Sequence, residues 1–585
     1  MTHMTTAGRA MVRTLQALGI ELVTTVPGES FLEVLDALYD ARDMTTLTFR
    51  HESGAAFMAE GYAKMSGRPA VVMATRAVGA GNLAIGVHTA RSDSTPLIVV
   101  LGQVDRKDKD REAFQEVDLL GMFRPLAKWV VEVGQGERLA WFIRRAYQEA
   151  VSGRPGPVVL IVPEDVFLDS VDMKSDDMKP DGVGMPHPMS PRTSLLSFET
   201  PIVYGGPDRM FIDAFYTLLR ESRRPAVIAG GGVRLSGARE LLASWASIHQ
   251  IPVYAAFRRQ DSFPAEHACY AGHLGLGTPS MIAEHLSEVD LWIALGTRLS
   301  EVTTQGYTLP HPHQRLIHIE RDPAVLARYP EAALSGAFDL KTFLEAITDS
   351  TFTPDASAIR VRERWCSTVK EAYLKSLQYP PKPSVYASIM QTISENLPEN
   401  AVIANDAGNF AGWIHRYLPF TVHRRQIAPT SGAMGYGLPA ALGAKWADPA
   451  RPVIVFAGDG GLMMTVQEIA TAVRYHLNVL VVVFNNALYG TIRQHQAHAY
   501  PGRVMATELS TVNFAAMAES MGALGRRVER PDAFAEAWAF GLERARGTQG
   551  LPVVLDVIVP PDEISVGRWL EELEGGKENG TTLSG

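Results

Sequence analysis

The chain has 585 residues, and because a domain usually holds roughly 150 residues, this length predicts three or four domains. Its 55 Lys and Arg against 64 Asp and Glu give a formal net charge of −9, which argues against a protein that binds nucleic acid or coats an anionic membrane. Two cysteines, Cys269 and Cys366, are too few for a disulfide scaffold. No signal peptide or membrane-spanning run is found, so we expect a cytoplasmic protein with a small-molecule partner.

Three apolar runs follow an Arg-Pro pair: AVVMAT after Pro69, AVIA after Pro225 and VIVFAG after Pro452. Such β-rich runs, each ending at a turn, are typical of buried parallel strands. Amphipathic helical stretches alternate with the apolar runs, as in residues 32–39 and 466–475. The pattern predicts an α/β protein with three doubly wound parallel sheets, and the all-α and all-β classes are excluded.

Composition shifts place the domain boundaries. We expect an N-terminal domain over residues 1–170, a linker over 171–206, a central domain over 207–350, a C-terminal domain over 375–565 and a tail over 566–585. The linker holds prolines, glycines and charges without periodicity. A weakly apolar segment near 351–383 separates the last two domains. From Gly575 onward the chain has too few apolar residues to pack, so we expect a frayed end.

The segment 455–490 carries the strongest chemical signal. It predicts a strand to Ala457, a glycine turn, a helix over 465–475 and a second strand over 479–484. A βαβ crossover can place the two strands side by side, so that Asp459 and Asn486 emerge from one sheet edge about 4.8 Å apart. Their carboxylate and amide oxygens suit a hard cation such as Mg²⁺. The neighbouring glycines, Gly458, Gly460 and Gly461, let backbone N–H groups approach a diphosphate.

The sequence Gly458-Asp459-Gly460, with Asn486 27 residues after Asp459, resembles the thiamine-diphosphate motif of the acetolactate synthase and pyruvate decarboxylase superfamily. The resemblance covers nearly the whole chain. It implies that the side chains of Asp459 and Asn486 and the main-chain carbonyl of Leu488 bind Mg²⁺. It also implies three α/β domains: an N-terminal pyrimidine-binding domain, a central nucleotide-like domain and a C-terminal diphosphate-binding domain.

Glu52 lies in HESGAAFMAEGYAKMSG, just before a helix expected from Gly54 to Lys64. Taken alone, an acidic residue here is one favoured at a helix N-terminus. Glu52 resembles the superfamily's catalytic glutamate. That residue bonds N1′ of the aminopyrimidine and exchanges a proton there.

Two further loops resemble those that hold the cofactor. In Ser431-Gly-Ala-Met-Gly-Tyr436, Met434 resembles the wedge between the two cofactor rings, and the Gly432 carbonyl resembles the acceptor for the 4′-amino group. Gly408 and Asn409, in Asp-Ala-Gly-Asn-Phe, resemble the loop that covers the diphosphate. Gln115, in Ala-Phe-Gln-Glu, resembles the glutamine that faces the substrate in the acetolactate synthase branch.

Two glycine-rich segments resemble turns that bind nucleotides. Residues 79–84, GAGNLA, fit a dinucleotide-binding fingerprint, but the acidic ribose partners available, Asp93 and Asp105, are interpreted as loop residues, so a nicotinamide dehydrogenase is the weaker alternative. Gly230-Gly231-Gly232 could hold FAD or ADP in the central domain. The downstream segment 296–301 lacks the pattern expected around a flavin, so whether FAD or ADP binds stays open.

The substrate end departs from the biosynthetic enzymes of the branch. Glu164 stands where they have lysine, His495 where they have tryptophan, and Glu29 where they have glycine. An acid and an imidazole replace a basic group and an aromatic wall, which puts the attraction of a substrate carboxylate and the selection of the acceptor in doubt.

The resemblance implies a thiamine diphosphate- and Mg²⁺-dependent carboligase or decarboxylase that acts on a 2-oxo acid, with pyruvate as the default donor. The alternatives are a 2-hydroxyacyl-CoA lyase or oxalyl-CoA decarboxylase type of lyase, and a simple 2-oxo acid decarboxylase. A non-catalytic homologue would require the loss of Glu52, Asp459 or Asn486, all of which are present. Because the family arrangement puts the cofactor between two subunits, we expect a homodimer or homotetramer.

Overall fold

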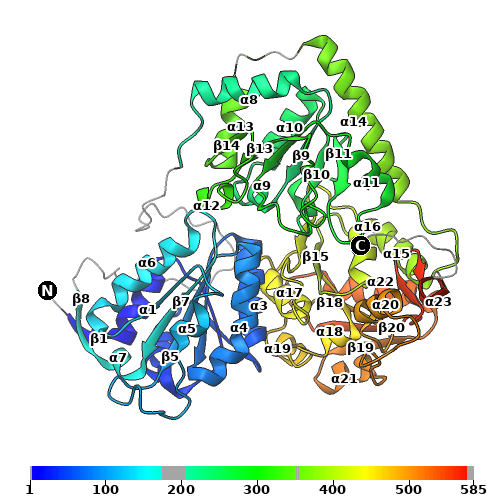
Figure 1. Ribbon diagram of the computed structural model, residues 1–585. Helices are drawn as coiled ribbons and strands as arrows, with labels where there is room; N and C mark the ends of the chain where they lie inside the picture. The colour runs from blue at the N-terminus through cyan, green and yellow to red at the C-terminus, as the bar shows by residue number, and fades with distance from the viewer. Residues whose placement is uncertain (1–2, 174–203, 351, 353–354, 576–585) are drawn as a thin grey trace. The chain divides into compact units, whose positions relative to one another are not determined.

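A computed structural model of the protein describes residues 3–173, 204–350, 352 and 355–575 (Figure 1). The described residues form two compact units. The first comprises the described part of residues 1–202 together with Ser431–Pro449 and Thr465–Leu477, and the second comprises the described parts of residues 203–430, 450–464 and 478–585. Most of the linker predicted over 171–206, and the tail beyond Gly575, lie outside the described residues.

The first unit is built around a six-stranded parallel sheet of order β3-β2-β4-β5-β7-β6. Its strands are β2 (Leu22–Thr25), β3 (Thr45–Thr48), β4 (Ala70–Thr75), β5 (Leu97–Gln103), β6 (Trp129–Glu132) and β7 (Pro157–Pro163). Helices α1, α2 and α6 pack on one face of the sheet, and α3 and α4 cover the other. Figure 1 shows α1 and α6 on one side and α3 and α4 on the other. Because both faces are covered, the central strands are apolar along nearly their whole length.

The helices of the first unit position its own candidate site residues. They are α1 (Ala7–Ala17), α2 (Leu32–Asp40), α3 (Glu52–Ser66), α4 (Arg76–Asp93), α5 (Leu119–Phe123), α6 (Leu139–Val151) and α7 (Glu164–Leu168), joined in this unit by α17 (Gly437–Ala447) and α19 (Glu468–Arg474). Helices α3 and α17 cross with their backbones in contact: a Cβ on Gly61 would lie 2.1 Å from the Ala440 carbonyl, and one on Gly443 would lie 2.1 Å from the Met58 carbonyl. Any larger residue at either glycine would force the two helices apart. A short antiparallel pair, β1 (His3–Thr6) with β8 (Ser170–Met173), completes the unit.

The central sheet, in the second unit, has the order β11-β10-β9-β12-β13-β14 and is parallel throughout. Its strands are β9 (Pro225–Ala229), β10 (Val253–Ala255), β11 (Tyr270–His273), β12 (Leu291–Leu295), β13 (Arg315–Ile319) and β14 (Leu334–Gly336). Its helices are α8 (Arg209–Glu221), α9 (Gly231–Leu235), α10 (Arg239–His249), α11 (Ser280–Leu286), α12 (Pro323–Leu326) and α13 (Leu340–Thr348). Numbered along the chain, the strand order is 3-2-1-4-5-6, the order of doubly wound dinucleotide-binding sheets.

The segment expected to separate the last two domains is largely one helix, α14 (Ala356–Ser376). Asp355 caps its first turn by accepting a hydrogen bond from the backbone N–H of Ala358. Trp365 and Tyr373 of α14 are buried in the core of the central sheet. Figure 1 shows α14 beside α11 and β11 of that sheet. The low apolar content of the segment therefore reflects a helix with one buried stripe and not a connection without structure.

The C-terminal sheet has the order β16-β15-β17-β18-β20-β19. Its strands are β15 (Val402–Asn405), β16 (Arg425–Ile427), β17 (Val453–Gly458), β18 (Leu480–Asn485), β19 (Leu524–Val528) and β20 (Val553–Ile558). Its helices within the second unit are α15 (Val385–Asn396), α16 (Phe410–Tyr417), α18 (Asp459–Leu462), α20 (Gly490–Ala499), α21 (Phe514–Ser520), α22 (Phe534–Ala545) and α23 (Leu570–Gly575), with a short antiparallel pair, β21 (Glu563–Ser565) and β22 (Arg568–Trp569). The glycine turn predicted after Ala457 is a helical turn, α18, and the helix predicted from residue 465 begins only at Glu468.

The predicted fold class is confirmed, because three parallel sheets with intervening helices are present. The three strands predicted from the Arg-Pro runs are β4, β9 and β17, and each is the third strand from one edge of its sheet. The first and last sheets share the order 2-1-3-4-6-5 when their strands are numbered along the chain, whereas the central sheet does not. No helix among the described residues is long and apolar enough to cross a membrane.

Candidate functional site

The carboxyl ends of β17 and β18 bring Asp459 and Asn486 together in the second unit. The two strands are parallel neighbours, with Gly458 paired to Phe484, and each polar residue lies at or just beyond the end of its strand. The carboxylate of Asp459 accepts hydrogen bonds from the backbone N–H of Gly460, at 2.9 Å, and of Ala487, at 2.7 Å. The backbone of the segment after β18 is therefore held directly by Asp459.

The turn after β18 orients Asn486 and Leu488. The side-chain carbonyl of Asn486 accepts a hydrogen bond of 3.1 Å from the backbone N–H of Leu488, and Ala487 between them has φ of 55°. Leu488 also forms an isolated antiparallel bridge to Glu508, which fixes the turn from its far side. Asp459, Asn486 and the backbone of Leu488 thus belong to one rigid turn.

Asp459 is a buried carboxylate, 7% exposed, without an ion-pair partner among the residues that the structure describes. Burial raises the pKa of Asp459 above its ordinary value, and the backbone N–H donors of Gly460 and Ala487 act in the opposite direction. A buried carboxylate without a counterion favours an added cation. No group of three or more His, Cys, Asp or Glu side chains suited to a metal ion occurs in the described ranges, so a cation here would draw on the amide, the carbonyl and the ligand's own oxygens.

The glycines beside Asp459 permit close packing at this edge. A Cβ on Gly461 would lie 2.7 Å from a carboxylate oxygen of Asp406, and one on Gly460 would lie 2.6 Å from the ring of Tyr489. Gly458, Gly460 and Gly461 add no side chains around Asp459 at the start of α18, so the backbone there can approach a ligand oxygen. The donor set and the open backbone fit a diphosphate with its cation.

Asn409 lies just before α16 and is tied to two other segments, α20 and β21. Its Nδ2 donates to the side-chain carbonyl of Gln494 at 2.7 Å and to the backbone carbonyl of Ile564 at 2.8 Å, and its Oδ1 accepts from the Thr491 hydroxyl at 2.9 Å. Gly408 before it has φ of 149°, a backbone conformation that favours glycine. Thr491 and Gln494 were not predicted, since only the fold brings α20 to this loop.

In the first unit, Glu52 is the first residue of α3, which starts two residues earlier than predicted. It is 7% exposed. Its Oε2 accepts a 2.9 Å hydrogen bond from Nδ2 of Asn82 on α4, and a Cβ on Gly79 would lie 3.1 Å from its Oε1. Asn82 is a site residue that the sequence interpretation missed.

The segment 79–84, considered as a dinucleotide turn, lies inside helix α4. It does not open a helix after a strand, because α4 already begins at Arg76. Its Gly79 lies against Glu52 of α3, whereas a Cβ on Gly81 would meet nothing within 4 Å. The interpretation of Asp93 as a loop residue was wrong: it is the last residue of α4, buried and paired with Lys64 at 2.5 Å. The geometry of this segment serves Glu52 and not a nucleotide ribose.

A second buried carboxyl faces α3 in the same unit. Glu468 begins α19, and a Cβ on Gly54 of α3 would lie 2.6 Å from its Oε1. That oxygen has no hydrogen-bond partner among the described residues. Burial raises the pKa of Glu468 to about 7. No motif in the sequence indicated Glu468, because its burial depends on the packing of α19 against α3.

The loop before α17, also in the first unit, contains Gly432 and Met434. Gly432 has φ of 72° and Gly435 has φ of 78°, so both adopt the left-handed conformation that favours glycine. The Gly435 carbonyl accepts a 2.7 Å hydrogen bond from the Thr465 hydroxyl. Met434 is half-buried between these two fixed glycines, so the loop presents its side chain from a defined backbone.

Behind this loop lies a buried charged network. The Tyr436 hydroxyl donates to Glu60 at 2.6 Å, and Lys64 lies 3.0 Å from Glu60 and 2.5 Å from Asp93. Burial raises the pKa of Glu60, while the positive charge of Lys64 opposes that change. The network joins α3, α4 and the start of α17, and so fixes the loop relative to Glu52.

Gln115 lies in a loop of the first unit with φ of 65°. Its backbone carbonyl accepts a 3.1 Å hydrogen bond from the N–H of Ala77, at the start of α4. Glu164, which stands where the biosynthetic enzymes have lysine, is paired with Arg76 at 2.7 Å. His495 is exposed on α20 in the second unit.

The glycines of the central sheet have a structural explanation. A Cβ on Gly230 would lie 2.2 Å from the Gly296 carbonyl, and one on Gly232 would lie 2.7 Å from the Gly296 Cα. The close approach of these two backbones requires the glycines whether or not a nucleotide binds. The binding of FAD or ADP stays an open prediction.

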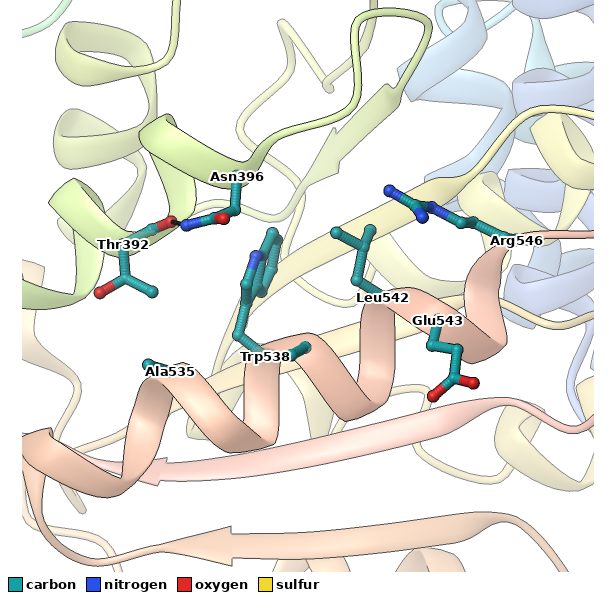
Figure 2. Close-up of a pocket in the computed structure, with 8 residues that line it drawn as sticks. Thr392, Asn396, Ala535, Trp538, Leu542, Glu543 and Arg546 are labelled. Carbon is teal, nitrogen blue, oxygen red and sulfur yellow. Dashed lines mark hydrogen bonds between the residues drawn. The ribbon is translucent and has the colours of Figure 1, made fainter.

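A pocket in the second unit lies between α15 and α22 (Figure 2). Its lining residues are Thr392, Asn396, Ala535, Trp538, Ala539, Leu542, Glu543 and Arg546. None of them is a predicted site residue, and no buried unpaired acid or base lines it. The pocket is therefore separate from the candidate site.

Three family models match the chain in order. They are the N-terminal thiamine pyrophosphate binding domain of thiamine pyrophosphate enzymes over residues 5–122, their central domain over 212–347, and their C-terminal thiamine pyrophosphate binding domain over 406–557. Together with the residues gathered within each unit, these matches define a thiamine diphosphate-dependent enzyme that forms or cleaves C–C bonds.

Curated relatives refine the class. A probable acetolactate synthase large subunit of Methanocaldococcus jannaschii is 32% identical over 95% of this chain and 92% of its own length. The acetolactate synthase isozyme 3 large subunit of Escherichia coli is 30% identical over 96% of each chain, and the large subunit of Lactococcus lactis is 29% identical over 96% of this chain and 93% of its own. The chain belongs to the thiamine pyrophosphate enzyme family, in its acetolactate synthase-like branch.

Proposed function

We propose that the protein uses thiamine diphosphate and Mg²⁺ to decarboxylate a 2-oxo acid and to transfer the resulting acyl carbanion equivalent to an acceptor carbonyl. The observation that carries this proposal is the buried carboxylate of Asp459, which has no ion-pair partner in the described part of the chain and lies beside Asn486 at the carboxyl ends of β17 and β18. Such an edge is where open α/β sheets bind ligands.

The residues of the second unit would hold the charged end of the cofactor. Asp459, Asn486 and the Leu488 carbonyl would bind Mg²⁺, while the backbone at Gly458, Gly460 and Gly461 would face the diphosphate. Gly408 and Asn409 would cover it from the neighbouring strand. When bound, thiamine diphosphate supplies an electron sink for the carbanion that decarboxylation leaves.

In the first unit, Glu52 would hold and release the proton at N1′ of the aminopyrimidine. Asn82 fixes Oε2 of Glu52, and Oε1 has no donor among the described residues, so one carboxylate oxygen stays available for proton exchange. Gly432 would accept from the 4′-amino group, and Met434 would support the cofactor between its rings. Gln115 would face the substrate.

The donor and acceptor follow from chemistry and from relatives. The relatives are named acetolactate synthases, which supports pyruvate as the donor. A 2-hydroxyacyl-CoA lyase or oxalyl-CoA decarboxylase activity and a simple decarboxylation are the alternatives, since the residues around Glu164 and His495 differ from the biosynthetic pattern. We further propose a cytoplasmic homodimer or homotetramer, with the domain limits given above.

The deciding experiment combines binding with product analysis. Calorimetry of thiamine diphosphate with Mg²⁺ should show tight binding to the wild type and none to Asp459→Ala, with Asp532→Ala on the exposed surface as the control. Incubation with a panel of 2-oxo acids, with and without CoA thioesters, then identifies the products. Equal cofactor affinity in Asp459→Ala and the wild type would refute the proposed site, and turnover confined to CoA thioesters would replace the carboligase by the lyase.

A further inference from the structure

Arg76, the first residue of α4, is the centre of a three-residue ionic cluster in the first unit. Its Nη1 lies 3.0 Å from Glu29 Oε1 and its Nη2 lies 2.7 Å from Glu164 Oε2. Arg76 itself is 8% exposed, whereas the side chain of Glu164 is 32% exposed and that of Glu29 is 64% exposed. A buried cation is therefore held between one sheltered and one open carboxylate.

The backbone ties this cluster to the loop that carries Gln115. Nη1 of Arg76 donates to the Phe114 carbonyl at 3.4 Å, and the N–H of Ala77 donates to the Gln115 carbonyl at 3.1 Å. Arg76 has φ of 40°, a left-handed conformation that a side chain of this size rarely adopts. Surrounding contacts must hold Arg76 in place, since its local preference is against this conformation.

The same helix reaches Glu52. Gly79, one helical turn after Arg76, lies against Oε1 of Glu52, and Asn82 binds Oε2. At 1.5 Å per residue, the six positions from Arg76 to Asn82 span about 9 Å of helix axis. Arg76 is thus placed on a rigid element between the Gln115 loop and the carboxylate proposed to move the proton.

The guanidinium has donor capacity that its partners do not use. Its Nε is buried and has no hydrogen-bond partner within the described ranges. Arginine presents five N–H groups in a planar fork that matches a carboxylate, and it stays charged at any working pH. The side chain of Glu29 is 64% exposed, so water can solvate its carboxylate when it leaves Arg76, while Glu164 keeps the buried cation paired.

We propose that Arg76 determines specificity by binding the carboxylate of the 2-oxo acid, and that Glu29 yields its position on the guanidinium when the substrate binds. This inference rests on the proposed function, since it assumes a 2-oxo acid substrate. It also accounts for the acidic residues at the substrate end, which are partners of Arg76 and not an unpaired repulsive charge. The substrate class is then a small 2-oxo acid recognised by its negative charge.

The test compares pyruvate with its neutral ester, methyl pyruvate. Affinity is measured by saturation-transfer NMR on the protein without added cofactor, and kcat/KM on the protein loaded with thiamine diphosphate and Mg²⁺. For Arg76→Gln we expect pyruvate affinity to fall roughly 10–100-fold, the scale of a lost charge-assisted contact, with methyl pyruvate unchanged. Glu29→Gln should bind pyruvate a few-fold more tightly, a gain that misfolding cannot produce.

Arg68→Gln is the matched control, because Arg68 forms an exposed pair with Glu21 at 2.6 Å and should leave pyruvate affinity unchanged. Wild-type pyruvate affinity in Arg76→Gln, or weaker pyruvate binding in Glu29→Gln, would overturn the proposal and make Arg76 only a counterion to the two glutamates. Thiamine diphosphate affinity is measured on every variant. If the wild type does not bind the cofactor, the proposed function fails. If the wild type binds the cofactor but pyruvate affinity is the same in Arg76→Gln, this inference alone fails.

Discussion

Asn82 donates a 2.9 Å hydrogen bond to Glu52 from a position 30 residues further along the chain. The bond joins α4 to the first residue of α3, so the orientation of the proposed catalytic carboxylate depends on α4. From its glycine pattern alone, residues 79–84 of this helix resemble a nucleotide-binding turn. One oxygen of Glu52 is held and the other faces Gly79. Asn82 is therefore a positioning residue for Glu52.

We expect Asn82→Ala to lower kcat about tenfold, the scale of one hydrogen bond to a charged group, without loss of thiamine diphosphate binding. The reason is that Glu52 keeps its carboxyl group but loses the contact that fixes its rotamer. Steady-state kinetics and cofactor calorimetry measure the two effects. Asn396→Ala is the matched control, since Asn396 is exposed and bonds only within its own helix. Unchanged kcat in Asn82→Ala would remove the positioning role.

Glu52→Gln should keep the cofactor but slow deuterium exchange at its reactive C2 carbon by about 10²–10⁴-fold, the usual contribution of one general acid–base group. An amide can hydrogen-bond to N1′ but cannot carry the proton. NMR of quenched exchange samples measures the rate. Glu240→Gln, an exposed acid in the first turn of α10, controls for a general effect of helix-start acids. Normal exchange in Glu52→Gln would leave this residue with a structural role alone.

Removal of divalent cations by a chelator should release thiamine diphosphate, and added Mg²⁺ should restore it. The physical reason is that Asp459 and the diphosphate are both anionic and repel each other without a bridging cation. Asn486→Ala should weaken the binding of Mg²⁺ and of the cofactor together, because the amide oxygen is one of the few protein ligands proposed for the metal. Calorimetry with and without Mg²⁺ separates these effects, and cofactor binding that ignores the chelator would contradict the metal bridge.

The sequence predicted the elements and motifs whose signal is local. The apolar runs gave β4, β9 and β17, and the spacing of Asp459 and Asn486 placed both at one sheet edge, because adjacent parallel strands end together. It could not find Asn82, Glu468 or Arg76. Their roles depend on contacts between elements distant in the chain, and no single-residue pattern marks a buried carboxyl or a strained arginine.

The start of α4 shows why the sequence alone does not predict the electrostatic effect of Glu29 and Glu164. In the sequence, Glu164 appears only as an acid in place of a lysine, and Glu29 as an acid in place of a glycine. Both lie next to the cation of Arg76, which comes from a third segment. The electrostatic effect of a single residue cannot be inferred from its sequence position when the opposite charge comes from a distant segment of the chain.

The buried carboxyl of Glu468 predicts a specific pH dependence of stability. Burial raises the pKa of Glu468 from the ordinary 4.5 to about 7, so between these values the folded protein holds a proton that the unfolded chain has lost. Stability should therefore fall as pH rises from 4.5 to 7, by roughly 3 kcal/mol in total at most, and stay lower above pH 7. Glu468→Gln should lose this decline, because an amide does not titrate. Thermal unfolding from pH 5 to 8 measures the difference between wild type and variant, in which the titration of other groups cancels. The exposed Glu137→Gln should follow the wild type, and parallel curves for Glu468→Gln and wild type would show that Glu468 titrates normally.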